Sequence, residues 1–335
     1  MRPVLSPASR RLWRDRTTLQ LGRPSSRAVV LEGFDEDRRR VLPLLDGTRS
    51  RQEVLAQAAA EGCHDAEHVL VLLEHAGLLL DADDLHSREL TRTDRERLAP
   101  DLASLALTRG ARAVSAIQAR RAARVVVHGA GRVGAPLASL LSGAGVGTVE
   151  VVDRQPTRAS DLAVRGLTEA DLGRPRGEAV GASLRSLSSV RRPALVVLTD
   201  ESSDDTAAAL LADGMPHLVA RVDEQVGTVG PLVLPGHSAC LHCLDLVRTE
   251  LDPGWPAVAA QLDQRGRTVA CDGVLAVAVA SQAALQALSL LEGDLPASVG
   301  GTLELELPGW RWRRRSWPRH PGCPCAWAVG LANAG

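Results

Sequence analysis

The clearest indication of the fold of this chain is the stretch Arg124-Val-Val-Val-His-Gly-Ala-Gly-Arg-Val-Gly134. Its valines predict a buried strand, and the apolar residues 135–141 predict a helix directly after the glycines. Glycines at such a turn allow a tight bend and close approach of the backbone to phosphate, and the helix N-terminus supplies N–H donors. The acidic Asp153 ends the next strand-like run, where a carboxylate accepts hydrogen bonds from a ribose. The sequence therefore predicts a nucleotide site, or a loop that only packs, at Gly129, Ala130, Gly131, Arg132, Gly134 and Asp153.

Strand-like runs alternate with Ala- and Leu-rich helical runs on both sides of this motif. The runs lie at 125–127, 149–152, 195–198 and 218–219. Such alternation predicts an α/β fold, with a Rossmann-like, mostly parallel sheet and helices on both faces. We expect this domain to occupy residues 102–335. The apolar run 274–291 is interrupted by four polar side chains, which favours a buried helix over a membrane span.

Residues 1–84 predict a separate, small, winged-helix-like α+β domain. Strand-like runs at 12–21 and 27–31 flank a turn-rich segment and predict a hairpin. Helical patterns follow at 35–45, after Gly47-Thr48 and at 66–76, and Leu78-Leu79-Leu80 predicts a returning strand. The charged residues 85–101 lack periodicity and predict a linker.

Composition limits the chemistry available to the chain. Its 335 residues include 39 basic residues, all of them arginine, against 40 acidic ones. Without lysine there is no Lys-bearing phosphate loop and no Schiff-base lysine, and the near-neutral charge argues against a nucleic-acid partner. Residues 1–16 lack the apolar stretch of a signal peptide, so we expect a cytoplasmic protein with no membrane partner and with reduced thiols.

Four of the six cysteines form two close pairs, Cys240-Leu-His-Cys243 and Cys323-Pro-Cys325. Two such pairs brought together by the fold supply a tetrahedral set of thiolates, which suits structural zinc and leaves no open position for catalysis. Unpaired thiols or a disulfide are the alternatives. Because four sulfurs fill the coordination shell, the neighbouring His242 and His320 are expected outside it.

Three further features have two interpretations each. Asp200 follows the run 195–198 and is expected at the same sheet edge as the glycine loop, where it either holds Mg²⁺ or caps the next helix. Cys271, at a predicted helix start, is either a reactive thiol or a packing residue. The alternating Trp310-Arg-Trp-Arg-Arg-Arg-Ser-Trp317 predicts a strand with tryptophans inward and arginines in solvent; nucleic-acid binding is the alternative.

The glycine loop, Asp153, the segment Gly173-Arg-Pro-Arg-Gly-Glu-Ala179, Asp200 and the cysteine pairs occur in an order that resembles the ThiF/MoeB superfamily of bacterial adenylyltransferases. The resemblance covers about 102–327. It implies that ATP lies on the glycine loop, that a polypeptide carboxylate attacks the α-phosphate to form an acyl-adenylate, and that the protein is a homodimer. It also implies roles for residues of this chain. The glycine loop would bind phosphate and adenosine through Gly129, Gly131 and Gly134, and Asp153 would bind the ribose. Asp200 would bind Mg²⁺ or the adenylate, Arg176 would bind phosphate in place of a family lysine, and zinc would be bound by Cys240, Cys243, Cys323 and Cys325.

One segment departs from the family pattern. The family's Ser-Asn-Leu-Gln-Arg-Gln is here Ser160-Asp-Leu-Ala-Val-Arg165, so Asp161 replaces the asparagine and Val164 the phosphate-binding arginine. Arg165, one residue further on, is expected to substitute for that arginine. The predicted catalytic residues are therefore Asp200, Arg176 and Arg165.

The N-terminal pattern resembles PqqD-type peptide-recognition domains, in which a leader peptide adds a strand to the hairpin edge. Such a domain fused to a ThiF-like one resembles partner proteins of azole-forming peptide cyclodehydratases; a purely structural winged helix is the alternative. Three functions follow as hypotheses. The first is ATP-dependent adenylation of a small protein or peptide, the second a non-adenylating scaffold that delivers a precursor peptide to a cyclodehydratase, and the third an NAD(P)-dependent oxidoreductase.

Overall fold

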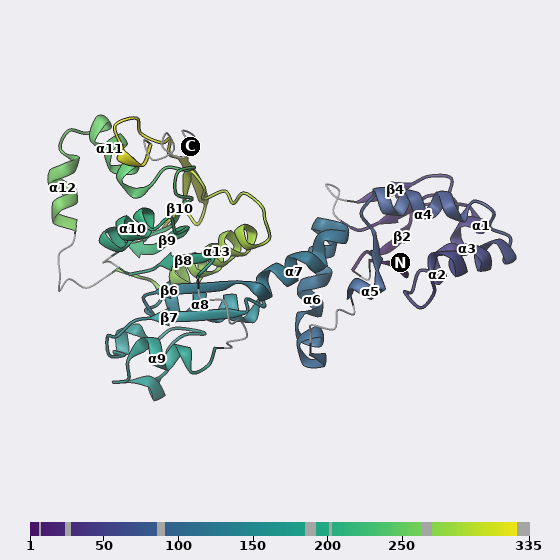
Figure 1. Cartoon of the computed structure of the whole chain (residues 1–335), viewed down its shortest axis with the longest axis horizontal. Coiled ribbons are helices and arrows are strands. Elements are labelled where there is room, and N and C mark those ends of the chain that lie inside the picture. The colour runs from purple at the N-terminus through teal and green to yellow at the C-terminus, as the bar shows by residue number, and fades with distance from the viewer. Residues whose placement is uncertain are drawn as a thin grey trace. The chain divides into compact units, whose positions relative to one another are not determined.

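The structure is a computed structural model that describes residues 1–6, 8–23, 28–85, 91–184, 192–200, 203–262 and 270–326. Its contacts divide the chain into two units, residues 1–118 and residues 119–335. Figure 1 shows both units and labels most of their elements. The ends of the predicted 85–101 linker and of the predicted 102–335 domain include residues outside the described ranges.

The first unit is built from two small antiparallel sheets and short helices. One sheet has the order β2-β3-β4, and the other pairs β1 with β5. The predicted strand 12–21 is two strands, because a turn closed by Arg14 N–H and the Thr18 carbonyl (3.0 Å) divides it. The predicted returning strand is β5. The elements are β1 (Pro3–Leu5), β2 (Arg11–Trp13), β3 (Leu19–Leu21), β4 (Val29–Leu31), α1 (Glu36–Arg39), α2 (Val41–Leu44), α3 (Arg51–Ala60), α4 (Ala66–His75), β5 (Leu79–Asp81) and α5 (Ala82–Leu85).

Helix α6 (Arg92–Arg109) begins ten residues before the predicted 102, inside the segment expected to be a linker. Thr91 caps it: its side chain accepts a hydrogen bond from Asp94 N–H. Arg92 and Glu96 form an i,i+4 ion pair on its surface. A charged helical turn lacks the apolar period by which helices are recognised, so its helical character was missed. A short 3₁₀ turn leads into α7 (Ala113–Ala122).

The second unit contains a seven-stranded sheet in the order β12-β11-β10-β9-β8-β6-β7. Strands β7, β6, β8 and β9 run parallel to one another, and β10, β11 and β12 add to β9 as antiparallel strands. The predicted Rossmann-like α/β fold is confirmed. The strands are β6 (Arg124–His128), β7 (Thr148–Val152), β8 (Leu195–Leu198), β9 (His217–Asp223), β10 (Val226–Val233), β11 (Gly301–Glu306) and β12 (Trp312–Ser316).

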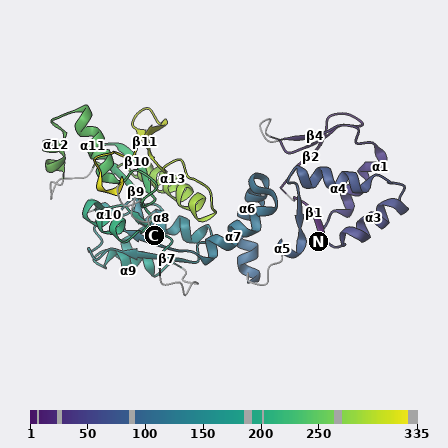
Figure 2. The same ribbon diagram turned by 45° about the horizontal axis from the view of Figure 1, so that its top comes forward.

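Helices cover both faces of the parallel half of this sheet. On one face Val125, Val127 and Leu195 pack in a core with α8 and α13, which run side by side (Figure 2). On the other, Val126 and Leu198 pack with α10. The helices are α8 (Gly134–Gly143), α9 (Arg176–Gly181), α10 (Ser203–Ala212), α11 (Leu241–Leu251), α12 (Trp255–Leu262) and α13 (Gly273–Leu291).

Helix α13 is long and apolar enough to cross a membrane by length and composition. Asp272 caps it through hydrogen bonds from Val274 N–H (2.8 Å) and Leu275 N–H (3.0 Å). Its buried side chains pack on β9 and β10, and nearly half of the helix lies inside the fold. The predicted buried helix matches this position in the core.

Strand β12 is an edge strand, and the prediction of inward tryptophans is wrong for two of the three. Trp310 and Trp312 are exposed, whereas Trp317, just after the strand, is 4% exposed. Trp317 donates a hydrogen bond from Nε1 to Thr302 Oγ1 (3.0 Å). Neither face of an edge strand need be covered, so alternation along it does not separate core from solvent.

Candidate functional site

The glycine loop connects the end of β6 to α8, and two of its glycines are required by close packing. Gly129 has φ of +89°, which side chains disfavour. A Cβ on Gly134 would lie 2.0 Å from the Gly129 carbonyl oxygen. Thr199 fixes this turn from the neighbouring strand end, because its hydroxyl shares one hydrogen between the carbonyl oxygens of His128 (2.9 Å) and Gly129 (3.0 Å).

Gly131 differs from these two, because nothing packs against it. The nearest atom to a Cβ placed there would be Arg176 Nη1, at 3.8 Å. The loop therefore leaves room for a ligand atom between the first turn of α8 and the Arg176 guanidinium. This arrangement suits a phosphate, whose charge is stabilised by N–H groups at a helix N-terminus.

Asp153 follows β7 and is anchored against the loop. Its Oδ2 accepts a hydrogen bond from Ala130 N–H (2.8 Å), and its Oδ1 accepts one from Gln155 N–H (2.9 Å). Arg176 Nη2 lies 2.9 Å from the same Oδ2. A carboxylate has about four acceptor positions, and these contacts occupy three of them, so one remains for a ribose hydroxyl.

Arg176, the first residue of α9, joins two carboxylates. Besides Asp153 it contacts Asp161, with 3.2 Å between Nη1 and Oδ1. Its Nε is buried and has no hydrogen-bond partner among the described residues. Asp161 is itself held by Arg158 N–H (2.9 Å). The sequence marked Asp161 only as a departure from the family; its pairing with Arg176 was missed, because no local pattern joins residues fifteen positions apart.

Asp200 lies beside the loop as expected. A Cβ on Gly129 would be 3.1 Å from Asp200 Cβ. Helix α10 begins at Ser203, and residues 201–202 are outside the described ranges, so the alternative that Asp200 caps this helix stays a prediction. A half-buried carboxylate at this edge suits a hard cation that also contacts phosphate oxygens.

Arg165 is not brought into this constellation. Its side chain is exposed, and its φ of +60° places it in a tight turn. Only its carbonyl is engaged, by Ser139 Oγ of α8 (2.9 Å), among the interactions of the described residues. Val164 beside it is 75% exposed. A role for Arg165 in phosphate binding stays a prediction that this geometry does not support.

Arg132 reaches away from the loop toward the start of α13. Its Nη1 donates to the Cys271 carbonyl (2.6 Å), and its buried Nε has no partner among the described residues. Burial raises the pKa of the Cys271 thiol, with Arg132 acting in the opposite direction. A half-buried thiol of raised pKa that packs on the core fits the packing interpretation of Cys271 better than the reactive one.

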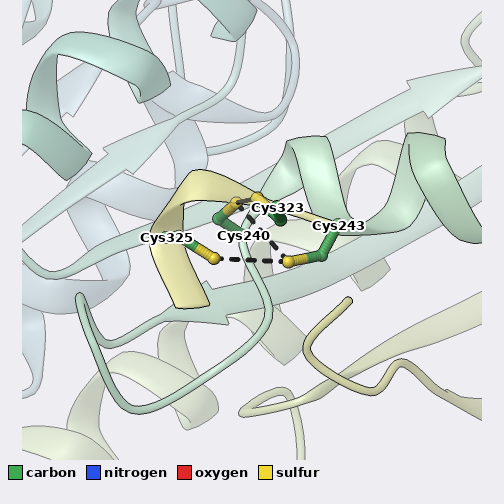
Figure 3. A group of neighbouring side chains, drawn as sticks. All are labelled: Cys240, Cys243, Cys323 and Cys325. Carbon is green, nitrogen blue, oxygen red and sulfur yellow. Dashed lines mark hydrogen bonds between the residues drawn. The ribbon is translucent and has the colours of Figure 1, made fainter. Parts of the chain in front are cut away.

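The four paired cysteines converge, as predicted (Figure 3). Cys240 caps α11, Cys243 lies in its first turn, and Cys323 and Cys325 come from the C-terminal turns. All four are buried, and their sulfurs lie within 4.8 Å of one another, with neighbours at 3.3, 3.6 and 3.8 Å. Tetrahedral zinc with Zn–S bonds of about 2.3 Å separates its sulfurs by about 3.8 Å. The observed separations lie on both sides of this value, so the donor set suits zinc.

The surroundings of this cluster bear on its protonation. Burial raises the pKa of Cys323 to about 11 and raises that of Cys325 as well. Burial acts the same way on Cys243, but N–H groups, His320 N–H (3.4 Å) among them, outweigh it and lower the pKa of this thiol. The His320 ring pairs with Glu250 (2.8 Å), which agrees with its expected place outside the coordination shell.

Part of the second unit resembles a known protein family. Residues 107–213 match the model of the ThiF family. The chain is 30% identical over 202 residues to the sulfur carrier protein ThiS adenylyltransferase of Bacillus subtilis (strain 168), an alignment that covers 51% of this chain. The chain spans about half, 55%, of the length of that relative.

Solved structures resemble the chain over nearly its whole length. E. coli MccB with ATP, and the microcin C7 biosynthetic enzyme MccB in complex with N-formylated MccA, each give a TM-score of 0.73 at 15% identity, covering 97% of this chain and 100% of theirs. PaaA gives 0.70 at 15% identity, covering 93% and 99%. At this identity the likeness establishes a shared fold.

Proposed function

We propose that this chain, which carries a ThiF family domain over residues 107–213, is an adenylyltransferase that transfers AMP from ATP to the carboxylate of a small protein or peptide. The observation that carries the proposal is the open position at Gly131, between the first turn of α8, Asp153 and Arg176. The similarity of the chain to the ThiS adenylyltransferase of Bacillus subtilis and to the MccB structures with ATP and with MccA supports it.

In this proposal the loop and α8 bind the phosphates, and Asp153 accepts hydrogen bonds from the ribose. A carboxylate oxygen of the polypeptide attacks the α-phosphorus. The bond from that phosphorus to the oxygen bridging to the β-phosphate breaks, and pyrophosphate leaves with its electron pair. Positioning and charge stabilisation dominate such chemistry, so the placement of Arg176 and Asp200 matters most.

Two cations complete the proposal. Mg²⁺ would be held by Asp200 together with phosphate oxygens, and would neutralise charge on the leaving group. Zinc would be held by Cys240, Cys243, Cys323 and Cys325, and its role would be structural because four sulfurs leave no open position.

We also propose that the first unit recognises a peptide in the PqqD-like manner. Its three-stranded sheet ends in β2, whose three residues are all exposed, including Leu12 and Trp13. An extended peptide can add to such an edge through main-chain hydrogen bonds. We further propose that the whole chain forms a homodimer and is located in the cytoplasm.

The test uses Gly131→Val, because the nearest atom to a Cβ there is the end of the Arg176 side chain, at 3.8 Å, and the added methyl groups would occupy the space assigned to phosphate. Titration calorimetry of the full chain with ATP and Mg²⁺ is expected to show at least tenfold weaker binding. Gly143→Val is the matched control, since Gly143 ends the same helix with nothing within 4 Å. If Gly131→Val binds ATP as the parent chain does, the phosphate is not on this loop.

A specific observation favours one alternative, a non-adenylating carrier of a precursor peptide. Arg176 is already paired with both Asp153 and Asp161, and Arg165 points to solvent. Peptide-dependent exchange of labelled pyrophosphate into ATP, lost in Asp200→Ala, supports adenylation. The absence of exchange, together with peptide binding that survives Asp200→Ala, supports the carrier, whose partner would be a cyclodehydratase.

A further inference from the structure

The three-stranded sheet of the first unit has a free edge at β2. Hydrogen bonds of 2.9 Å at the Arg10 carbonyl and of 3.0 Å at Arg14 N–H are directed toward the β3 side. Because main-chain groups alternate in direction along a strand, the N–H and carbonyl groups of Arg11 and Trp13 point away from β3. None of these four groups has a main-chain partner among the described residues. Strand β2 can therefore pair with one more strand along this edge.

Arginines lie on both faces of β2 beside the free edge. Arg11 pairs with Leu21, so it lies on the face of the sheet that packs on the core. Arg10 and Arg14, at alternating positions, lie on the opposite face. Arg16 follows in the turn, and all four arginines are exposed. A strand added to β2 would therefore meet guanidinium groups on both of its faces.

A fifth arginine approaches this edge from α1. The guanidinium carbon of Arg39 lies 3.7 Å from the centre of the Trp13 ring, and Arg39 Nη2 donates a hydrogen bond to the Arg16 carbonyl. The Arg39 Nε is buried without a hydrogen-bond partner among the described residues. Trp13 remains 42% exposed beside it. Tryptophan and arginine side chains dominate the binding energy of many interfaces, so this pair suits a bound polypeptide.

The acidic residues of this region do not balance its positive charge. Residues 8–23 and 28–40 contain eight arginines. The acidic residues of the same ranges are Asp15, Glu32, Asp35, Glu36 and Asp37. A sixth carboxylate, Asp65, pairs with Arg38 from outside these ranges. Eight arginines against six carboxylates leave an excess of two positive charges.

Most of these carboxylates are engaged away from the free edge. Asp15 accepts a hydrogen bond within its own turn, from the N–H two residues on (2.8 Å). Asp35 caps α1, and Asp37 lies 3.7 Å from Arg40. Glu32 follows β4, which is two strands, or about 10 Å, from β2. Among the described residues, no carboxylate forms an ion pair with Arg10, Arg11, Arg14, Arg16 or Arg39.

We propose that the free edge of β2 binds an extended acidic segment of the polypeptide substrate, whose main chain pairs with Arg11 and Trp13 and whose carboxylates contact the surrounding arginines. The inference rests on the peptide recognition proposed above and adds to it the charge of the peptide. Guanidinium and carboxylate groups form paired, charge-assisted hydrogen bonds. Nucleic acid fits less well, because a sugar–phosphate chain lacks the alternating N–H and carbonyl groups that pair with a strand edge.

The first experiment tests the charge by fluorescence anisotropy with the full chain. The probe is a fluorescein-labelled peptide, Thr-Asp repeated four times, and the matched probe has asparagine in place of aspartate. At low salt the acidic probe is expected to bind about tenfold more tightly, and this advantage should shrink as salt rises. Arg10→Gln plus Arg14→Gln is expected to weaken binding of the acidic probe about fivefold.

The matched control is Arg311→Gln plus Arg313→Gln, which removes the same charge from exposed positions at another edge strand, β12. It is expected to bind the acidic probe as the parent chain does. Equal binding of the two probes, or an equal loss in both double variants, would overturn the proposal.

The second experiment tests strand addition. An acidic probe methylated at every backbone nitrogen keeps its charge but donates no main-chain hydrogen bonds, and we expect it to bind at least tenfold more weakly. Arg11→Pro removes an N–H that points away from β3, a position at which an edge strand tolerates proline. It should bind the unmethylated probe about fivefold more weakly than Arg11→Gln, which loses the same charge. Equal binding of the methylated and unmethylated probes contradicts the proposal, and so does tighter, equally arginine-dependent binding of a labelled oligothymidylate.

ATP titration of the parent chain separates this inference from the proposed function. Normal ATP binding, together with equal binding of the aspartate and asparagine probes, rejects the acidic segment and leaves peptide recognition in place. Normal ATP binding with no binding of either probe rejects the peptide site at β2. Failure of the parent chain to bind ATP rejects the adenylation proposal, whatever the probes do.

Discussion

The cysteine cluster and the nucleotide crevice occupy the same unit but are organised in opposite ways. The four sulfurs meet one another within 4.8 Å, and no cationic side chain is paired to them among the described residues. In the crevice, Arg176 is bound by Asp153 and Asp161. The cluster can therefore bind a cation without losing an ion pair. In the crevice, Arg176 must give up a contact with a carboxylate before it can bind a ligand. A ligand set without internal partners therefore indicates its ligand more directly than one whose charges already neutralise one another.

The largest effect is expected at the cluster. Cys243→Ser removes one of four sulfur ligands, and we expect bound zinc to fall from about one per chain to near zero. A loss of about 4 kcal/mol would lower Tm by roughly 10 °C, at about 2–4 °C per kcal/mol for a unit of this size. Elemental analysis and calorimetry provide the measurements. Cys271→Ser, outside the cluster, is the control, and normal zinc content in Cys243→Ser would contradict the assignment.

The next effect concerns the glycine loop and tests whether the crevice is as tightly built as the cluster. Gly134→Ala places a methyl group about where the Gly129 carbonyl lies, 2.0 Å from its oxygen. We expect a loss of about 2–3 kcal/mol in the free energy of unfolding, measured by urea denaturation. Gly143→Ala, at the other end of the same helix, should be neutral or slightly stabilising. Similar midpoints for the two variants would show that the loop tolerates a side chain.

A smaller effect separates the two types of site directly. Asp161→Asn removes one of the two charges paired with Arg176, so the guanidinium is freer to bind phosphate. We expect ATP to bind about fivefold more tightly, which corresponds to about 1 kcal/mol.

Asp171→Asn makes the same change at the exposed Arg174 pair and should leave ATP affinity within about twofold. If Asp161→Asn instead weakens ATP binding, then Asp161 positions Arg176 for the ligand and does not compete with it.

The smallest effect is a pH dependence near the cluster. His217 pairs across the sheet with Val233, which packs with the cysteines. Burial lowers the pKa of His217 below its ordinary 6.5, so the unfolded chain binds this proton more readily. Its contribution to stability is therefore complete above about pH 6.5 and is lost progressively as the pH falls below that value.

Between pH 7 and pH 5.5, the free energy of unfolding should fall less in His217→Asn than in the parent chain. The difference should be less than about 1 kcal/mol. Urea denaturation at the two pH values measures it, with the exposed His64→Asn as control. An unchanged slope would mean that other groups, such as the cysteines, dominate the acid sensitivity.

Much of the fold was predictable because its signals are local. The strand and glycine turn at 124–134 and the strands at 148–152 and 195–198 lie where apolar runs and glycines placed them. The start of α6 was missed because its first turns are charged. The exposure of Trp312 was missed because strand alternation does not reveal which strand becomes the edge of a sheet.

The candidate site also has residues that local sequence predicts and contacts that it does not predict. Gly129, Gly134 and the cysteine pairs were identified from residue type and short spacing, and the structure gives each a geometric reason. The pairing of Arg176 with Asp161 and the exposure of Arg165 depend on contacts between distant segments.

By itself, the sequence determined the kind of turn after β6 and the presence of four thiols in two short pairs. These properties belong to backbone sterics and to chemical identity, and they hold in any conformation that forms the local elements. Which charges neutralise one another, and which remain available, depends on how distant segments come together in the folded chain. That outcome depends on distances across the sheet of a few ångströms, over which Coulomb energies change severalfold with burial and separation.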